Sequence, residues 1–188
     1  MNAGVDDGMR VLDLSDKFSP EQYGSSPHSG THVDSPAYLL SEGKKIEEFG
    51  PERFITDAVL LDLSHKKAGE PIDDEDLEAA EEAAGLAVRE GESVILHTGI
   101  APSIHLSRNG AEYLEFKRVG LVGIDAVSID NPESAEKTAH RVLLGKDILV
   151  LEGLRNLDSI SCSRFRLVSL PLKLSAATSP VRAVAILE

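Results

Sequence analysis

The sequence predicts an α/β or α+β domain around a mixed β-sheet. Segments typical of strands and of helices alternate through the middle of the chain, whereas both ends are richer in strand-like segments. With 188 residues, the chain is long enough to enclose one well-filled core. No stretch has the composition of a linker, so one domain is expected over residues 1–188.

The N-terminal part predicts two strands separated by a polar segment. Residues 9–14 have the composition of a short strand, and a loop over residues 15–27 follows it. The apolar run at residues 57–63 predicts a second, buried strand.

The pattern then becomes helical. Residues 73–89 are rich in Ala, Glu and Leu, and Asp73 or Asp74 is expected to cap the start of this helix. Its acidic residues indicate a solvated face, and those in the first turn complement the helix dipole. The apolar residues 92–98 predict the next strand.

A second and a third helix follow in the same alternation. Residues 109–117 predict a helix capped by Asn109, and residues 119–125 predict a strand. Residues 134–144 predict a helix that Gly145 closes, because glycine suits a helix C-terminus.

The C-terminal part returns to strands, expected over residues 147–151, 165–170 and 181–187. Gly120 and Gly123 lie in the strand before the third helix, but no third glycine opens a helix at the spacing of a dinucleotide-binding fingerprint. We therefore do not expect a nucleotide site.

The composition excludes several classes of partner. Nineteen basic residues stand against 32 acidic ones, a net charge of −13, which repels nucleic acid and anionic membranes. Cys162 is the single cysteine, so no intrachain disulfide is expected. The first ten residues lack the apolar core of a signal peptide, and no apolar run approaches the roughly 20 residues of a membrane span. We expect a cytoplasmic protein with a small-molecule substrate.

The most informative segment is residues 28–36, which holds two imidazoles and a carboxylate. Gly30 and Pro36 argue against a helix, so the segment is expected to be extended. Side chains alternate along an extended chain, so His28, His32 and Asp34 should face the same side, as a shared metal ion requires. The alternative is a structural turn.

Nitrogen and oxygen ligands without a thiolate suit zinc, manganese or another divalent first-row ion. Three groups from one segment leave coordination positions open, so further ligands should converge from elsewhere. The candidates are His140, in the third predicted helix, and Glu152, at the end of the apolar strand after it. A tight turn at Gly145 can bring the two together, although both can also be ordinary surface residues.

These residues resemble a known family. The segment His28-Ser-Gly30-Thr31-His32-Val-Asp34-Ser-Pro36 matches the motif His-x-Gly-Thr-His-x-Asp-x-Pro of the metal-dependent cyclase family, which includes bacterial kynurenine formamidase and isatin hydrolase. The resemblance continues through most of the chain. It can be followed in residues 58–64, 94–99, 120–130, 140–157, 171–173 and 179–183.

The resemblance implies a swivelling β/β/α domain, a homo-oligomer (dimer or tetramer), and one or two divalent ions per chain, Zn²⁺ or alternatively Mn²⁺. By matching position, His28, His32 and Asp34 would bind the first ion. Asp34 could bridge to a second ion held by His140 and Glu152. The implied reaction is hydrolysis of a small amide or cyclic amide by metal-activated water.

One position departs from the family pattern. Formamidase-type members carry a histidine four residues beyond the aspartate of the motif, where this chain has Tyr38. A phenol with an ordinary pKa near 10 is protonated at neutral pH, so it can donate a proton but is a poor base. It would face the metal if the strand continued through Pro36. The alternative is that Tyr38 packs against Leu39 and Leu40.

Two further departures concern the substrate pocket. The segment 15–27 is shorter than in relatives, and the chain has no tryptophan, which makes an aromatic-lined pocket less expected. His97 stands where relatives often have arginine. It is either a substitute acid or base or, as we favour, a histidine at a strand end.

Other polar residues receive no chemical role from the sequence. Asp125, Ser128 and Asp130 follow a strand, where such residues commonly cap turns and helices. Arg182 could contact a substrate, but a surface ion pair is the favoured interpretation. His65 and His105 are expected to lie in polar loops.

Three functional hypotheses result. The first is a metal-dependent hydrolase acting on C–N bonds other than peptide bonds, arylformamidase-like, with Tyr38 as a proton donor. The second is a metal-dependent cyclase or dehydratase, that is, a lyase. The third is a metal- and ligand-binding protein that has lost turnover because Tyr38 replaces the histidine of the family.

Overall fold

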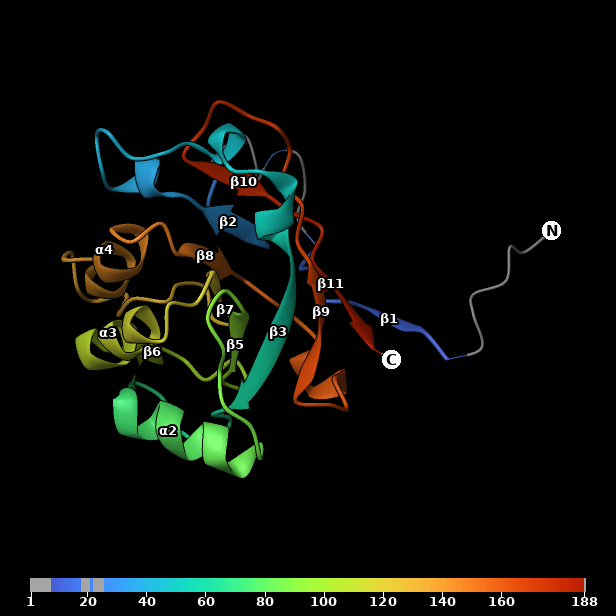
Figure 1. Cartoon of the computed structure of the whole chain (residues 1–188). Helices are drawn as coiled ribbons and strands as arrows, with labels where there is room; N and C mark the ends of the chain where they lie inside the picture. Colours follow the sequence, from blue (N-terminus) through green and yellow to red (C-terminus); the bar gives the residue numbers. More distant parts are fainter. Residues whose placement is uncertain (1–7, 18–20, 22–25, 188) are drawn as a thin grey trace.

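The computed structural model describes residues 8–17, 21 and 26–187 (Figure 1). Within them, nine strands form one curled sheet in the order β1-β11-β9-β3-β5-β7-β8-β2-β10, and β4 pairs with β6 separately. The strands are β1 (Arg10–Asp13), β2 (His32–Asp34), β3 (Ile55–Asp62), β4 (Pro71–Ile72), β5 (Ser93–His97), β6 (His105–Leu106), β7 (Leu121–Ile124), β8 (Leu149–Glu152), β9 (Arg164–Val168), β10 (Thr178–Pro180) and β11 (Val184–Leu187).

The helices are α2 (Asp74–Ala83), α3 (Arg108–Phe116) and α4 (Thr138–Leu144). They connect the four central strands β3, β5, β7 and β8, which are parallel. The strands on either flank of this parallel group pair antiparallel. The prediction of an α/β fold around a mixed sheet is confirmed.

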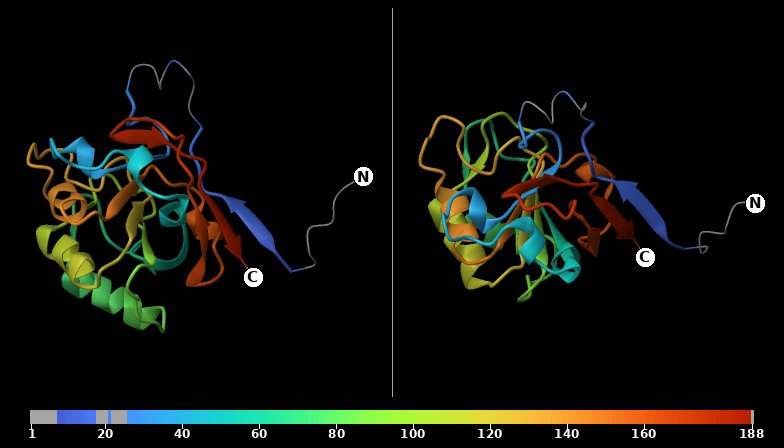
Figure 2. Two further views of the ribbon diagram at one scale, coloured as in Figure 1. Left: turned by 45° about the horizontal axis from the view of Figure 1, so that its top comes forward. Right: turned by 90° about the horizontal axis from the view of Figure 1, so that it is seen from above.

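The central strands β5, β7 and β8 are buried on both faces. In β5, Val94 and Leu96 belong to the core under the helices, whereas Ile95 between them belongs to a second core enclosed by the curled ends of the sheet. In β8, Val150 and Leu151 divide between the two cores in the same way. The helices cover one face, and β1 and β11 lie on the side away from them (Figures 1 and 2). This double burial explains the continuous apolar runs.

Helix α2 is shorter than predicted. It begins where expected, with Asp73 accepting a hydrogen bond from the backbone N–H of Asp76. It ends near Gly85, which has a φ of +66°. The N–H groups of Gly85 and Leu86 bond to the carbonyls of Glu82 and Glu81, which is the Schellman pattern of a helix end.

Helix α3 has a different N-cap residue from the one that the sequence predicted. Ser107, not Asn109, accepts a hydrogen bond from the backbone N–H of Gly110, so the predicted cap was wrong by two residues. A serine hydroxyl is an equally good cap, and the backbone of Ser107 is in the extended conformation that a cap requires.

Helix α4 begins four residues later than predicted. The side chain of Asn131 accepts a hydrogen bond from the backbone N–H of Glu133, and that of Ser134 accepts one from Glu136. These local turns replace the first predicted turn of the helix. The helix ends at Gly145 as predicted.

The predicted strands are present with shifted ends, but three short strands were not predicted, β4, β6 and β10. Each has two or three residues, too few for a period-two pattern. None of the helices in the described residues is long and apolar enough to cross a membrane.

Candidate metal centre

The motif segment approaches the sheet through a bend. His32 and Asp34 lie in β2, as the extended prediction required, but His28 precedes the strand, and Gly30 has a φ of +64°. The parity argument was therefore wrong for His28. The bend still returns its side chain to the site, because His28 Nδ1 lies 3.3 Å from Asp34 Oδ1.

Close packing stabilises this bend. The hydroxyl of Thr31 donates a hydrogen bond of 2.7 Å to the carbonyl of Gly153. Gly153 has a φ of +70°, and a Cβ added there would lie 2.5 Å from the carbonyl oxygen of Gly30. Only glycine at position 153 allows the two segments to approach this closely.

Strand register brings further polar residues to the same place. Strand β2 lies between β8 and β10 (Figure 1). His32 is opposite Glu152 in β8, and Asp34 is opposite Thr178 in β10. Directly opposed residues place their side chains side by side on one face.

The fifth predicted ligand comes from α4, which packs beside β8 (Figure 1). His140 Nε2 lies 3.4 Å from both Asp34 Oδ2 and Glu152 Oε1. The turn after Gly145 returns the chain into β8, as the sequence predicted for this pair. All five predicted ligand residues thus meet.

The potential ligand atoms form two overlapping groups. One consists of His28, His32 and Asp34, and the other of Asp34, His140 and Glu152. In each group the atoms lie within 4.8 Å of one another. Asp34 belongs to both, as a carboxylate shared between two ions would.

The burial of the cluster tests whether a cation fits. His32 and His140 are 1% exposed, Asp34 is 0% exposed, and Glu152 is 3% exposed. His32 Nε2, Asp34 Oδ2 and His140 Nε2 are buried without a hydrogen-bond partner. In the described part of the chain, no lysine or arginine pairs with either carboxylate. Because buried carboxylates need a compensating positive charge, this donor set fits a divalent cation.

The protonation equilibria also show an environment that stabilises positive charge. Burial opposes protonation of His140, but the hydrogen bond with Asp130 and the negative charges of Glu152 and Asp34 outweigh it and raise its pKa to about 9. Burial likewise opposes protonation of His32, yet Glu152 and Asp34 raise its pKa above the ordinary value. Burial favours the neutral form of Asp34, whereas His140 and His28 lower its pKa.

Tyr38 reaches the cluster by a route that the sequence did not predict. The strand does not continue, because Pro36–Tyr38 form a short 3₁₀ helix. The ring centre of Tyr38 nevertheless lies 4.5 Å from that of His28 and 5.3 Å from that of His140. Tyr38 and Leu39 both pack partly against the core under the helices. The expected packing of Tyr38 against Leu39 and Leu40 stays a prediction. Burial, and the negative charges of Asp34 and Glu152, raise the pKa of Tyr38.

Asp130 has a role at this centre that sequence reasoning missed. Its Oδ2 atom lies 2.5 Å from His140 Nδ1, and its Oδ1 atom accepts a hydrogen bond of 2.7 Å from the backbone N–H of Ala139. It therefore orients His140 and caps the first turn of α4. The sequence signal for this contact was an acidic residue ten positions before the proposed ligand His140.

The remaining polar residues match their structural interpretations. Asp125 accepts hydrogen bonds from the backbone of Thr98, which follows β5. His97 ends β5, with Nδ1 3.6 Å from Asp62. Ser128 forms a local turn, and Arg182 pairs with Asp13 on the surface.

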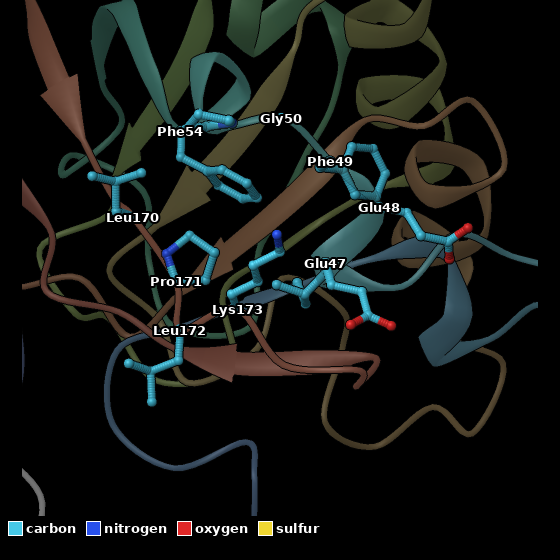
Figure 3. Close-up of a pocket in the computed structure, with 11 residues that line it drawn as sticks. Glu47, Glu48, Phe49, Gly50, Phe54, Leu170, Pro171, Leu172 and Lys173 are labelled. Carbon is cyan, nitrogen blue, oxygen red and sulfur yellow. The ribbon is translucent and has the colours of Figure 1, made fainter.

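A separate groove lies away from the cluster. It has a volume of about 510 Å³ and is lined by residues 46–51, Phe54 and residues 170–173, none of which belongs to the cluster (Figure 3). Phe49, Phe54 and Pro171 form apolar walls, and Glu47 and Lys173 add charge to its lining (Figure 3).

Comparison with known proteins agrees with this geometry. The model of the family Cyclase, described as "Putative cyclase", matches residues 5–131. A kynurenine formamidase of Erythrobacter litoralis is 32% identical over 162 residues, which cover 85% of this chain and 74% of the relative. A kynurenine formamidase of Bacillus thuringiensis is 33% identical over 184 residues, covering 89% and 83%.

Two solved structures share the fold. One, titled a potential metal-dependent hydrolase with cyclase activity, is 25% identical, has a TM-score of 0.80, and is matched over 95% of this chain and 98% of its own. Isatin hydrolase A of Labrenzia aggregata is 21% identical, with a TM-score of 0.83 and coverage of 95% and 94%. The match over most of the sequence and the shared fold establish that this chain belongs to the cyclase family.

Proposed function

We propose that this protein is a metal-dependent hydrolase that cleaves a non-peptide C–N bond in a small amide or cyclic amide. The observation that carries the proposal is the convergence of three unpartnered, buried ligand atoms from His32, Asp34 and His140. The kynurenine formamidases among the relatives, at about one-third identity, support the class of bond.

In this proposal the metal ligands are His28, His32, Asp34, His140 and Glu152. Zinc is the expected ion, with manganese as the alternative, because the set offers only nitrogen and oxygen. One or two ions fit, since the ligand atoms form two groups that share Asp34. A bound divalent ion polarises a carbonyl and lowers the pKa of a coordinated water toward about 7.

The substrate is expected to enter past His28 and Tyr38. The side chain of His28 is 29% exposed, whereas the other four proposed ligands are almost completely buried. Tyr38 is half-buried beside His28. Its phenol is protonated at neutral pH, so it can donate a hydrogen bond to the substrate and a proton to the leaving nitrogen.

The lyase and the ligand-binding hypotheses predict different outcomes with the same ligand set. A lyase would eliminate water from its substrate, and product analysis would show this. A binding protein would hold metal and ligand without any product. Homo-oligomeric assembly and a cytoplasmic location stay predictions from the sequence.

The experiment compares metal content and amide hydrolysis in the parent protein and two histidine variants. Protein purified without a histidine tag is analysed by elemental mass spectrometry and assayed on aryl formamides and on cyclic amides. His32→Ala should lose both metal and hydrolysis. His97→Ala is the matched control, because His97 lies at a strand end beside Asp62, and it should retain both. A parent protein without zinc or manganese after incubation with either ion would refute the proposal, as would unchanged hydrolysis in His32→Ala.

A further inference from the structure

Two of the buried proposed ligands form hydrogen bonds with main-chain groups. His32 Nδ1 lies 3.0 Å from the carbonyl oxygen of Gly30, so this nitrogen donates and leaves Nε2 free. Glu152 Oε1 accepts a hydrogen bond of 2.7 Å from the backbone N–H of Ile129. In His32 the main-chain group determines which ring nitrogen faces the other ligands. In Glu152 it fixes the carboxylate, with Oε1 3.4 Å from His140 Nε2 and Oε2 3.2 Å from His32 Nε2.

Asp34 is held differently. Its Oδ1 atom accepts a hydrogen bond of 2.5 Å from the hydroxyl of Thr178, which is itself buried. The two residues are 144 apart in sequence and directly opposite in the β2–β10 pair. Apart from this hydroxyl, the described neighbours that interact with the carboxylate of Asp34 are His28, His32 and His140, all proposed ligands themselves.

We propose that Thr178 is a positioning residue for the metal centre, whose hydroxyl holds the Asp34 carboxylate in the orientation that presents Oδ2 to His140 and His32. The inference rests on the proposed function, because it assigns Asp34 as a ligand.

The chemistry of the two groups explains this assignment. A carboxylate only accepts hydrogen bonds, and its orientation is determined by its donors. When imidazole nitrogens bind a cation through their lone pairs, they no longer donate to Asp34, and Thr178 is the donor that stays in place. Outer partners of this kind orient ligands and increase metal affinity.

The inference also assigns a role to the C-terminal part of the chain. Strand β10 is the edge strand beside β2, and it has three residues (Figure 1). Its pairing with β2 delivers the hydroxyl to the one carboxylate that both groups of ligand atoms share. The motif and this contact are 144 residues apart in a chain of 188, so the edge pairing joins distant parts of the sequence at the proposed metal site.

The test measures zinc affinity by competition with a chromophoric chelator, on the parent protein and four variants. Thr178→Val preserves the shape and the strand preference of the residue but removes the hydroxyl. Thr178→Ala removes the hydroxyl together with the branched side chain. Thr178→Ser restores the hydroxyl. Ser35→Ala is the matched control, because Ser35 donates a hydrogen bond of 2.9 Å to the carbonyl of Ala177 next to the same strand pair but does not bond to the Asp34 carboxylate.

We expect Thr178→Val and Thr178→Ala to weaken zinc binding by about 10- to 100-fold. Thr178→Ser and Ser35→Ala should bind zinc nearly as tightly as the parent, even where thermal unfolding of the metal-free variants shows a loss of stability. Parent-like affinity in a folded Thr178→Val or Thr178→Ala protein would overturn the inference. So would an equal loss in Ser35→Ala, which would indicate general loosening of β10. A parent protein that binds no ion would refute the proposed function itself.

Discussion

Replacing Asp130 by asparagine should weaken metal binding without touching a proposed ligand. The two oxygens of Asp130 accept hydrogen bonds from His140 Nδ1, at 2.5 Å, and from the backbone N–H of Ala139, at 2.7 Å. Asparagine has one oxygen and one NH₂ group, so it cannot accept both. If the oxygen stays on Ala139, the NH₂ group faces Nδ1, and the proton of His140 moves to Nε2.

That tautomer directs an N–H group, instead of a lone pair, toward Asp34 and Glu152. In the other amide orientation, the NH₂ group opposes the N–H of Ala139, which leaves a buried donor unpaired. We therefore expect zinc affinity to fall by about 10- to 100-fold, or roughly 1.4 to 2.8 kcal/mol. The free energy of unfolding of the metal-free protein should fall by about 1 to 3 kcal/mol.

The assay is a competitive zinc titration together with chemical denaturation of the metal-free protein. Asp125→Asn is the control, because Asp125 is also a buried aspartate that accepts hydrogen bonds from the backbone, at Thr98 and Gly99, but contacts no proposed ligand. It should lose stability and keep its zinc affinity. Unchanged affinity in Asp130→Asn, or an equal loss in Asp125→Asn, would refute the reasoning.

Three other predictions concern the same centre. Tyr38→Phe should lower kcat by about 10²- to 10⁴-fold at unchanged zinc content, measured by steady-state kinetics, if the phenol donates a proton; full activity would exclude that role. Gly153→Ala should destabilise the protein by more than about 1 kcal/mol in chemical denaturation, because it combines a positive φ with a clash against Gly30. Gly85 has a similar φ, but no atom lies within 4 Å of a Cβ added there, so Gly85→Ala should lower the free energy of unfolding by less. Equal losses of stability in the two variants would disprove the clash. Because the pKa of His140 is raised to about 9 in the metal-free protein, zinc binding should release a proton and tighten as the pH rises from 7 to 9. Calorimetry in buffers of different ionisation enthalpy measures this release, and heats independent of the buffer would contradict it.

Local sequence determined the central part of the fold. The apolar runs of β3, β5, β7 and β8 and the helical segments between them depend on periodicity within a few residues, so the parallel α/β unit could be predicted. Helix ends were predicted less well. Ser107 and Asn109 are both good caps, and the choice between them depended on backbone conformation.

The sequence by itself also determined the chemistry of the site. The spacing of His28, His32 and Asp34 indicated a metal centre, and the position of Glu152 at the end of an apolar strand indicated a carboxylate that needs a cation. These are properties of residue type and local order, which the sequence contains directly.

Only the tertiary structure decided how these groups are held. Strand pairing places Thr178 opposite Asp34 across 144 residues, and the turn before α4 places Asp130 behind His140. The Thr178 contact has no local pattern, because it depends on strand register. The Asp130 contact spans only ten residues, but it depends on the conformation of a turn that this spacing alone does not specify. The residue types therefore indicated a site for a divalent cation, whereas long-range packing determined which atoms of the side chains face one another there.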